Sequence, residues 1–342
     1  MKTSAVYRLL AYVLGNEEAD EVFRHVMVDN ALLGASFRGK VGRAAIAQAL
    51  SLSLFHDLIR RVPSARRYVY EARTPREKLV LDHGSVRTVN LEGMGALPAG
   101  HRAIHRLIVP LGYEIADEYP MPWIHMVGRS YRHIDHPETI PQFFVSEIST
   151  SRFPDDVQHR ITETFSESRD PLTPKLVSHL AKLEACGSLS FRDAADVVLR
   201  VARCFDRQHD LPKIDDYDAM RGHSSELAWI STEGNTFNHI TIRVNDLADL
   251  HEHLRAEGFA VKDGIEVSAS GTVLQTALRA DSVSRRFRGP ASSFVERVVP
   301  GSFCEFIERR RALCSDGTER LDLSFDPKNA TAIFKMTEAS EP

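Results

Sequence analysis

The sequence lacks the features that mark several large classes of protein. It has no apolar run approaching the roughly 18 residues that suggest a membrane-spanning helix. Its 4 cysteines show no CxxC spacing and are too sparse for a disulfide framework, which fits a reducing cytosol. It contains neither a glycine-rich phosphate loop nor a GxSxG motif, so nucleotide-dependent and serine-hydrolase functions lose support. We therefore expect a cytoplasmic protein without a membrane partner.

Charge of either sign is not concentrated anywhere in the chain. Lysine and arginine together number 43, aspartate and glutamate number 47, and no long tract of one sign occurs. This balance gives no sign of a nucleic-acid partner and favours a small-molecule ligand. With 342 residues the chain is long for one ordinary core, which indicates two modules or one duplicated module with additions. Nothing in the sequence predicts an oligomeric state.

Helical and strand-like patterns alternate along the chain in two similar rounds. Apolar residues recur at helical spacing over 4–14, 18–29 and 42–61, whereas strand-like segments begin at 79 and again at 235. Each opening strand is followed by a helix and three strand candidates, so we expect an α+β fold built on duplicated βαβββ modules. The predicted parts are an N-terminal helical cap (1–78), a first module (79–150), an inserted helical region (151–234), a second module (235–312) and a C-terminal tail (313–342).

The two opening strands share a residue pattern. LDHGSVR, with His83 and Arg87, matches FNHITIR, with His239 and Arg243, as apolar, polar, histidine, three residues, arginine. Because side chains alternate along a strand, each histidine and its arginine lie on one face. A lone strand histidine is more often structural than a ligand, but the duplicated frame favours a metal role for both.

Each module also ends on a strand that carries a glutamate, Glu147 in FFVSEIS and Glu305 in FCEFIER. Strand alternation places Glu305 between Phe303 and Ile307 on one face. A carboxylate buried there is costly unless a cation or strong donors meet it. Glu147 remains open as a vestigial counterpart of Glu305, a fourth ligand or a structural acid, and we favour a role other than ligand.

Two neutral imidazoles and one carboxylate form the facial triad suited to Fe(II) oxygen chemistry. We therefore predict a metal site at His83, His239 and Glu305, although Mn(II), Ni(II) or Zn(II) would also fit these ligands. The guanidinium of Arg87 could bind a substrate carboxylate at two points. Arg87 and Arg243 could instead pair with nearby acids, and this alternative weighs more for Arg243.

Other histidines invite a different assignment. His101 and His105 have the i, i+4 spacing of a helical zinc pair, but no glutamate completes an HExxH motif. His125, His133 and His136 fall near a strand and a turn, where solvated histidines are common. We expect none of these five to bind metal.

The segments that carry the repeat resemble those of a known family. DHGSVRTV, LGYEIADEYP, IPQFFVSEIS, FNHITIRV, VLQTAL and PGSFCEFIER occur in order through both modules. Together they resemble the 2-oxoadipate dioxygenase/decarboxylases, which are related to the vicinal oxygen chelate superfamily. The resemblance implies modules of vicinal-oxygen-chelate type that form a metal-binding, β-barrel-like core.

The resemblance also implies an activity and roles for residues. In that family the matching histidines and glutamate bind Fe(II), which here gives His83, His239 and Glu305 catalytic roles, and the two histidines border the substrate. The arginine matched by Arg87 contacts the substrate carboxylate. The implied reaction converts 2-oxoadipate and O2 to 2-hydroxyglutarate and CO2 in lysine catabolism.

This sequence differs from the family in the length that follows the closing glutamate strand. Family members are longer, and part of their substrate pocket follows the closing glutamate strand, where this sequence has only residues 306–342. The resemblance therefore supports the metal chemistry more strongly than it supports the chain length of the substrate.

Two alternative functions remain open. An oxygen-independent isomerase or lyase on the same scaffold would use the same ligands, and a metal-free ligand-binding module would need none of them.

Overall fold

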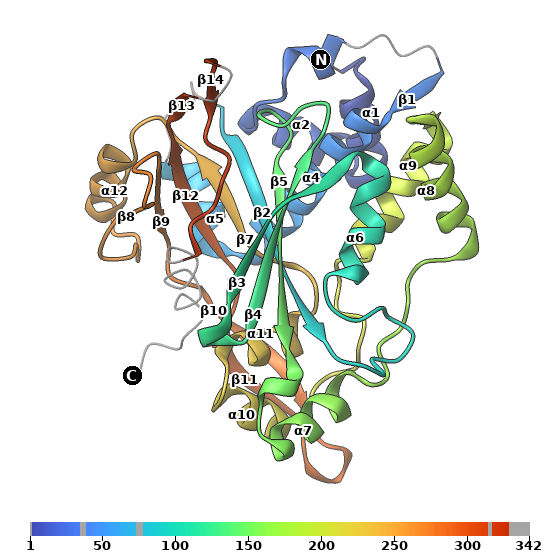
Figure 1. The fold of residues 1–342 in the computed structure, drawn as a ribbon, viewed down its shortest axis with the longest axis vertical. Coiled ribbons are helices and arrows are strands. Elements are labelled where there is room, and N and C mark those ends of the chain that lie inside the picture. The colour runs from blue at the N-terminus through green and yellow to red at the C-terminus, as the bar shows by residue number, and fades with distance from the viewer. Residues whose placement is uncertain (1, 35–38, 73–77, 314–316, 328–342) are drawn as a thin grey trace.

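An eight-stranded, curled sheet forms the centre of the molecule, and helices cover its outer side (Figure 1). This computed structural model describes residues 2–34, 39–72, 78–313 and 317–327. The fold is α+β, as the sequence predicts. In these described ranges no helix is long and apolar enough to cross a bilayer.

The sheet combines both modules in one continuous order, β3-β4-β5-β2-β7-β12-β9-β8. The first module contributes β2 (Val80–Asn90), α6 (Arg102–Ile108), β3 (Tyr113–Met121), β4 (Met126–His133) and β5 (Gln142–Ser149). The second contributes β7 (Phe237–Arg243), α12 (Leu247–Ala256), β8 (Glu266–Val267), β9 (Val273–Ala277) and β12 (Phe303–Arg309). Read outwards from the centre, the two halves have equivalent strand orders, because β5 corresponds to β12, β4 to β9 and β3 to β8.

The two opening strands meet at the centre of the sheet. β2 and β7 run antiparallel, with His83 opposite Thr241 and Ser85 opposite His239. Each histidine therefore faces the residue two positions after the other histidine. This symmetric register places both histidines on the same face of the sheet, in adjacent strands.

The outer face of the sheet packs against the N-terminal and inserted helices. Val86, Ile240, Ile242 and Phe306 alternate with the polar positions of their strands and belong to the main apolar cluster. The helices of this layer are α1 (Ala5–Leu14), α2 (Asn16–His25), α4 (Arg43–Arg61), α5 (Pro63–Arg67), α8 (Pro174–Cys186) and α9 (Phe191–Arg203). Ser190 caps α9 by accepting from the Asp193 backbone N–H at 3.2 Å.

The second module contains a hairpin that its sequence did not reveal. β10 (Ser282–Arg288) and β11 (Phe294–Pro300) form a separate two-stranded sheet inserted between β9 and β12. The hairpin packs on α10 (Ile214–Arg221) and α11 (Ser225–Glu233) through Phe287 and Val299. Together with α7 (Asp155–Phe165) these elements gather at one end of the molecule (Figure 1).

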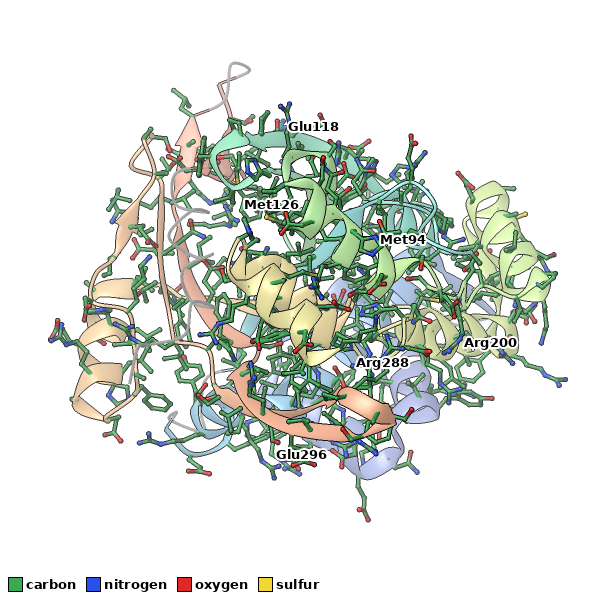
Figure 2. The ribbon with its side chains drawn as sticks, turned by 90° about the horizontal axis from the view of Figure 1, so that it is seen from below. Met94, Glu118, Met126, Arg200, Arg288 and Glu296 are labelled. Carbon is green, nitrogen blue, oxygen red and sulfur yellow. The ribbon has the colours of Figure 1, made fainter. Side chains whose placement is uncertain are left out.

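A second apolar cluster fills the space between the first module and the inserted helices. Met94 and Met126, labelled in Figure 2, pack there with Phe165 and Trp229. The remaining short elements are α3 (Asn30–Gly34), β1 (Lys40–Gly42), β6 (Ser188–Ser190), β13 (Arg311–Leu313) and β14 (Glu319–Leu321). Most of the predicted tail, residues 328–342, and Cys314 lie outside the described residues.

Candidate metal centre

His83, His239 and Glu305 converge on the inner face of the sheet. They come from the adjacent strands β2, β7 and β12, and their exposed fractions are 2%, 4% and 1%. Glu305 Oε2 lies 3.4 Å from His83 Nε2 and 3.5 Å from His239 Nε2. Among the described residues, this is the one group of three or more potential metal ligands whose donor atoms all lie within 4.8 Å of one another.

Strand register explains this convergence. Thr241 lies opposite His83 on β2 and beside Glu305 on the parallel strand β12, so all three side chains share one face. The Thr241 hydroxyl donates to Glu305 Oε2 at 2.5 Å and lies 3.0 Å from His83 Nε2. Gln275 Nε2 donates to Glu305 Oε1 at 2.8 Å. The glutamate is therefore oriented by two neighbouring strands.

The ring of His83 is oriented from behind by the preceding residue. Its Nδ1 lies 2.9 Å from Asp82 Oδ2, which identifies Nδ1 as the protonated nitrogen because a carboxylate can only accept. A β-bulge between Leu81 and His83 breaks the alternation of the strand and accounts for Asp82 reaching this neighbourhood. Burial alone would raise the pKa of Asp82, but the charge of Arg309 and the hydrogen bonds from His83 and Arg309 hold it below its ordinary value.

His239 is oriented in the same way. Its Nδ1 donates to Asn238 Oδ1 at 3.1 Å, and the same oxygen accepts from Arg87 Nη2 at 3.0 Å. Burial lowers the pKa of His239 well below its ordinary value, and the charges of His83 and Arg87 act in the same direction. A neutral imidazole with its Nδ1 proton engaged presents the Nε2 lone pair, which is the form that binds metal.

These donors fit a divalent metal. Both Nδ1 protons are engaged in hydrogen bonds, and the Thr241 hydroxyl donates its hydrogen bond to Glu305. The lone pairs of His83 Nε2, His239 Nε2 and Glu305 Oε2 therefore face one another. Burial raises the pKa of Glu305, although the charge of His83 and the hydrogen bond from Thr241 oppose this rise. Two metal bonds of about 2.1 Å that meet at a right or tetrahedral angle separate their ligand atoms by about 3.0 to 3.4 Å. The observed separations from Glu305 are close to that range.

Arg87 lies on the same face but is bound to protein groups. It is 1% exposed, its Nε donates to Glu226 of α11, and Nη1 donates to Ser85 Oγ at 3.2 Å and to Ser146 Oγ at 3.0 Å. Burial lowers the pKa of Arg87, while the negative charge of Glu226 opposes this shift. Glu226 was not foreseen from the sequence, where it is an ordinary first-turn acid. A substrate carboxylate at Arg87 would have to share donors with these residues.

The two closing glutamates are not structural counterparts. Glu305 lies beside Thr241, the second residue after His239. The equivalent residue in the first module is Ser85, the second residue after His83, and Phe144 lies beside it. Glu147 instead lies beside Thr88, on the opposite face, and accepts from the backbone N–H of His101 at 2.7 Å. The sequence repeat therefore aligned these strands three positions out of register, and Glu147 is not among the three converging donors.

The remaining candidates do not join the three converging residues as ligands. Arg243 Nη2 donates to the backbone carbonyl of Glu138 at 3.0 Å. His101 Nδ1 lies 2.9 Å from Glu147, and His105 Nδ1 lies 3.2 Å from the Tyr131 hydroxyl. His125, His133 and His136 are likewise absent from the metal-like group found among the described residues.

Part of the C-terminal tail covers the candidate metal centre. The Phe325 ring stands edge-on to His83 with ring centroids 4.8 Å apart, and it also contacts Phe144 at 4.9 Å and Tyr119 at 5.9 Å. The Phe325 backbone N–H donates to the Tyr119 hydroxyl at 3.2 Å. The short tail therefore supplies an apolar wall, which the sequence had left undecided.

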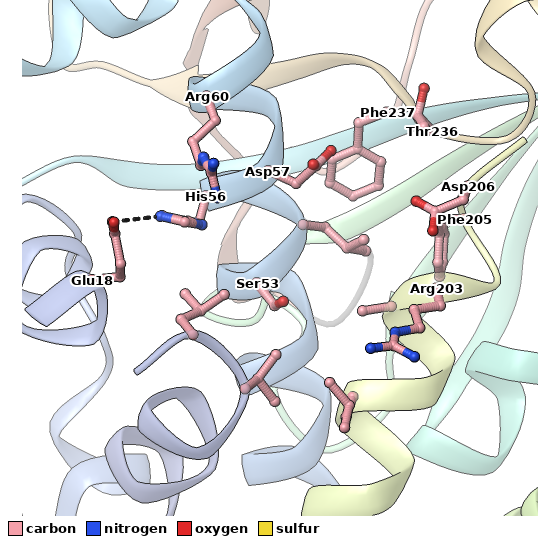
Figure 3. Close-up of a pocket in the computed structure, with 15 residues that line it drawn as sticks. Glu18, Ser53, His56, Asp57, Arg60, Arg203, Phe205, Asp206, Thr236 and Phe237 are labelled. Atoms are coloured by element: carbon pink, nitrogen blue, oxygen red, sulfur yellow. Dashed lines mark hydrogen bonds and ion pairs between the residues drawn. The ribbon is translucent and has the colours of Figure 1, made fainter. Parts of the chain in front are cut away.

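A separate cavity of about 350 Å³ lies on the helical side of the sheet (Figure 3). It is bordered by α4, α9 and Phe237, and Figure 3 shows the contact of His56 with Glu18, 2.8 Å long, at its edge. None of the three converging side chains lines it.

Comparisons with known proteins agree on one family. The family model described as 2-oxoadipate dioxygenase/decarboxylase matches residues 52–339. A 2-oxoadipate dioxygenase/decarboxylase of Mycobacterium bovis is 26% identical over 266 residues, which are 74% of this chain and 63% of that protein. The chain thus spans less than two thirds of the length of this curated relative.

Solved structures show the same fold. A crystal structure from Ralstonia eutropha JMP134, described as a glyoxalase superfamily protein, has 43% identity and a TM-score of 0.89, covering 94% of this chain and 98% of that one. The hydroxyglutarate synthase of Oryza sativa, solved with 2-oxoadipate, has 18% identity and a TM-score of 0.64, covering 86% and 93%.

Proposed function

Because the chain belongs to the 2-oxoadipate dioxygenase/decarboxylase family, we propose that it converts 2-oxoadipate and O2 to 2-hydroxyglutarate and CO2. We further propose that Fe(II) is the cofactor and that His83, His239 and Glu305 hold it. The convergence of these three buried donors on one point is the observation that carries the proposal. The equation balances, since the carbon lost from the 2-oxo acid leaves as CO2 and the oxygen atoms of O2 are shared between the products.

Bound Fe(II) would supply electrons for reducing O2 and a Lewis acid for the 2-oxo acid. The contribution of the chain is to fix the geometry around that ion. Asp82 and Asn238 hold the two imidazoles with Nε2 facing Glu305. Thr241 and Gln275 hold the carboxylate, so the donors are oriented before a metal arrives.

Substrate binding draws on two further groups. Arg87 provides positive charge on the face of the candidate metal centre, and we propose that it attracts a carboxylate of the substrate. Phe325, Phe144 and Tyr119 form an apolar wall next to His83. This wall excludes water from the reacting groups and strengthens the electrostatic contribution of Arg87.

The deciding experiment is anaerobic reconstitution with Fe(II), followed by 2-oxoadipate and air. We expect O2 uptake matched by CO2 and 2-hydroxyglutarate, and loss of all three in Glu305→Ala. His159→Ala is the matched control, because this side chain is 74% exposed and lies outside the candidate metal centre. No turnover across a panel of 2-oxo acids would contradict the proposal. Turnover without O2 would support the isomerase or lyase alternative.

A further inference from the structure

Arg309 ends the strand that carries Glu305, and its side chain is fully buried, with 0% exposed. Nε and Nη2 donate to the two carboxylate oxygens of Asp82 at 2.8 and 2.9 Å. Nη1 donates to the backbone carbonyls of Asp322 and Ser324, both at 2.8 Å. One guanidinium therefore joins a side chain of β2 to the chain segment that follows β14.

Both Asp82 and this segment contact His83. Asp82 fixes the imidazole through Nδ1, as described above. The segment 322–325 carries Phe325, whose ring covers the same imidazole. The guanidinium of Arg309 also lies 5.0 Å from the centre of the Phe325 ring, a cation–π distance. The orientation of the candidate ligand and the wall above it thus depend on the same buried cation.

We propose that Arg309 is a positioning residue that couples the seating of segment 322–325 to the orientation of His83. This inference rests on the proposed metal role of His83. A buried guanidinium keeps its geometry only while its acceptors are in place, because an unpaired charge is costly away from water. Loss of the Asp82 carboxylate therefore releases the segment, although the segment lies on the far side of Arg309. Loss of Arg309 disturbs both.

Local packing alone would give a different outcome. If Arg309 merely neutralised Asp82, a change at Asp82 would affect His83 and leave residues 322–325 unaltered. The hydrogen bonds of the Asp82 side chain in the described structure go to His83 and Arg309 and not to this segment. Asp82→Asn preserves the size of the side chain and removes its charge, so it tests the coupling with little change of shape.

The first test is hydrogen exchange of a peptide spanning 319–327 in the metal-free protein. In Asp82→Asn we expect exchange in this peptide to rise by about tenfold, since a local opening is made easier. Arg309→Met should do the same. Arg310→Met is the control, because Arg310 has a side chain 56% exposed and pairs with Glu308. Unchanged exchange in Asp82→Asn would overturn the proposal even if Arg309→Met fails to fold.

The second test is metal affinity, which separates this inference from the proposed function. Asp82→Asn should weaken Fe(II) binding by about 10- to 100-fold, as expected for a group that orients a ligand. Phe325→Ala keeps both backbone acceptors of Arg309 and should change affinity less than about threefold. If the unaltered protein binds no metal but the exchange effect appears, the proposed function fails and the coupling stands. If metal binds and exchange does not respond, only the coupling fails.

Discussion

His83 and His239 are distinguished from the other histidines by the residue that precedes each of them. Asp82 and Asn238 accept the Nδ1 protons and leave both Nε2 atoms facing Glu305. The sequence contained this signal, because the repeated pattern has a polar residue before each histidine. The pattern alone does not identify these residues as hydrogen-bond acceptors, because that function depends on the orientations of the two imidazole rings.

The roles of two residues near the candidate metal centre, Glu226 and Thr241, could not be identified from the sequence. Glu226 lies in a helix of the inserted region, and its pairing with Arg87 depends on how α11 packs on β2. Strand alternation puts Thr241 on the face of His239, yet its contacts with His83 and Glu305 follow from the register between strands. A single sequence does not encode such pairings in a local pattern.

Arg87→Ala is predicted to retain Fe(II) and to raise the KM for 2-oxoadipate by about 10- to 100-fold. The reason is that the proposed charge-assisted hydrogen bond to the substrate is lost, while Asn238 still accepts from His239. Steady-state kinetics together with metal analysis measure both effects. Arg243→Ala serves as the control, because it removes the matching arginine of the second module, whose guanidinium is bound to the Glu138 carbonyl. Loss of iron in Arg87→Ala would contradict this division of roles.

At the scale of elements, the opening strands and their helices follow from sequence periodicity and turn chemistry. β2 and β7 begin within two residues of the predicted strands at 79 and 235. The pairing of closing strands was predicted less well, because the two glutamates suggested an alignment that the sheet does not adopt. Identical residue types at similar spacing are weak evidence for register, since a shift by an odd number of positions exchanges the two faces.

Gly84→Ala should destabilise the pairing of β2 with β7. A Cβ at Gly84 would lie 2.2 Å from the Phe237 ring, which packs against β2 from the helical side. We expect the free energy of unfolding to fall by about 1 to 3 kcal/mol, the usual cost of overpacking a buried site. Urea denaturation measures this change. Gly264→Ala, where an added Cβ meets no atom within 4 Å, should stay within about 0.5 kcal/mol of the unaltered protein.

At the scale of the whole molecule, two long-range features escaped prediction. The β10–β11 hairpin interrupts the second module, and the segment carrying Phe325 returns to cover a strand from the first. The packing of this hairpin on α10 and α11 and the contact of Phe325 with His83 both join residues far apart in sequence, and no periodicity reports them. The overall α+β class and the presence of two related halves were predicted, because hydrophobic periodicity and an internal repeat are local features.

Metal binding should stabilise the molecule as a whole, because the ligands come from both halves of the sheet. With free Fe(II) at about 100 times its dissociation constant, mass action adds about 2.7 kcal/mol to the free energy of unfolding. An anaerobic melting curve should therefore show a higher Tm with Fe(II) and a return to the original Tm with a chelator. Glu305→Ala should show no such shift. An equal rise of Tm in Glu305→Ala would indicate that the metal binds elsewhere.

The most direct measurement is anaerobic titration of the unaltered protein with Fe(II), in parallel with His83→Ala, His239→Ala and Glu305→Ala. We expect saturation at an equimolar amount of Fe(II) for the unaltered protein and no specific binding in any of the three variants, because two buried ligands alone do not hold the ion. His159→Ala should bind like the unaltered protein. Absence of binding in the unaltered protein, or undiminished binding in the three variants, would contradict the assignment of these residues as the metal centre.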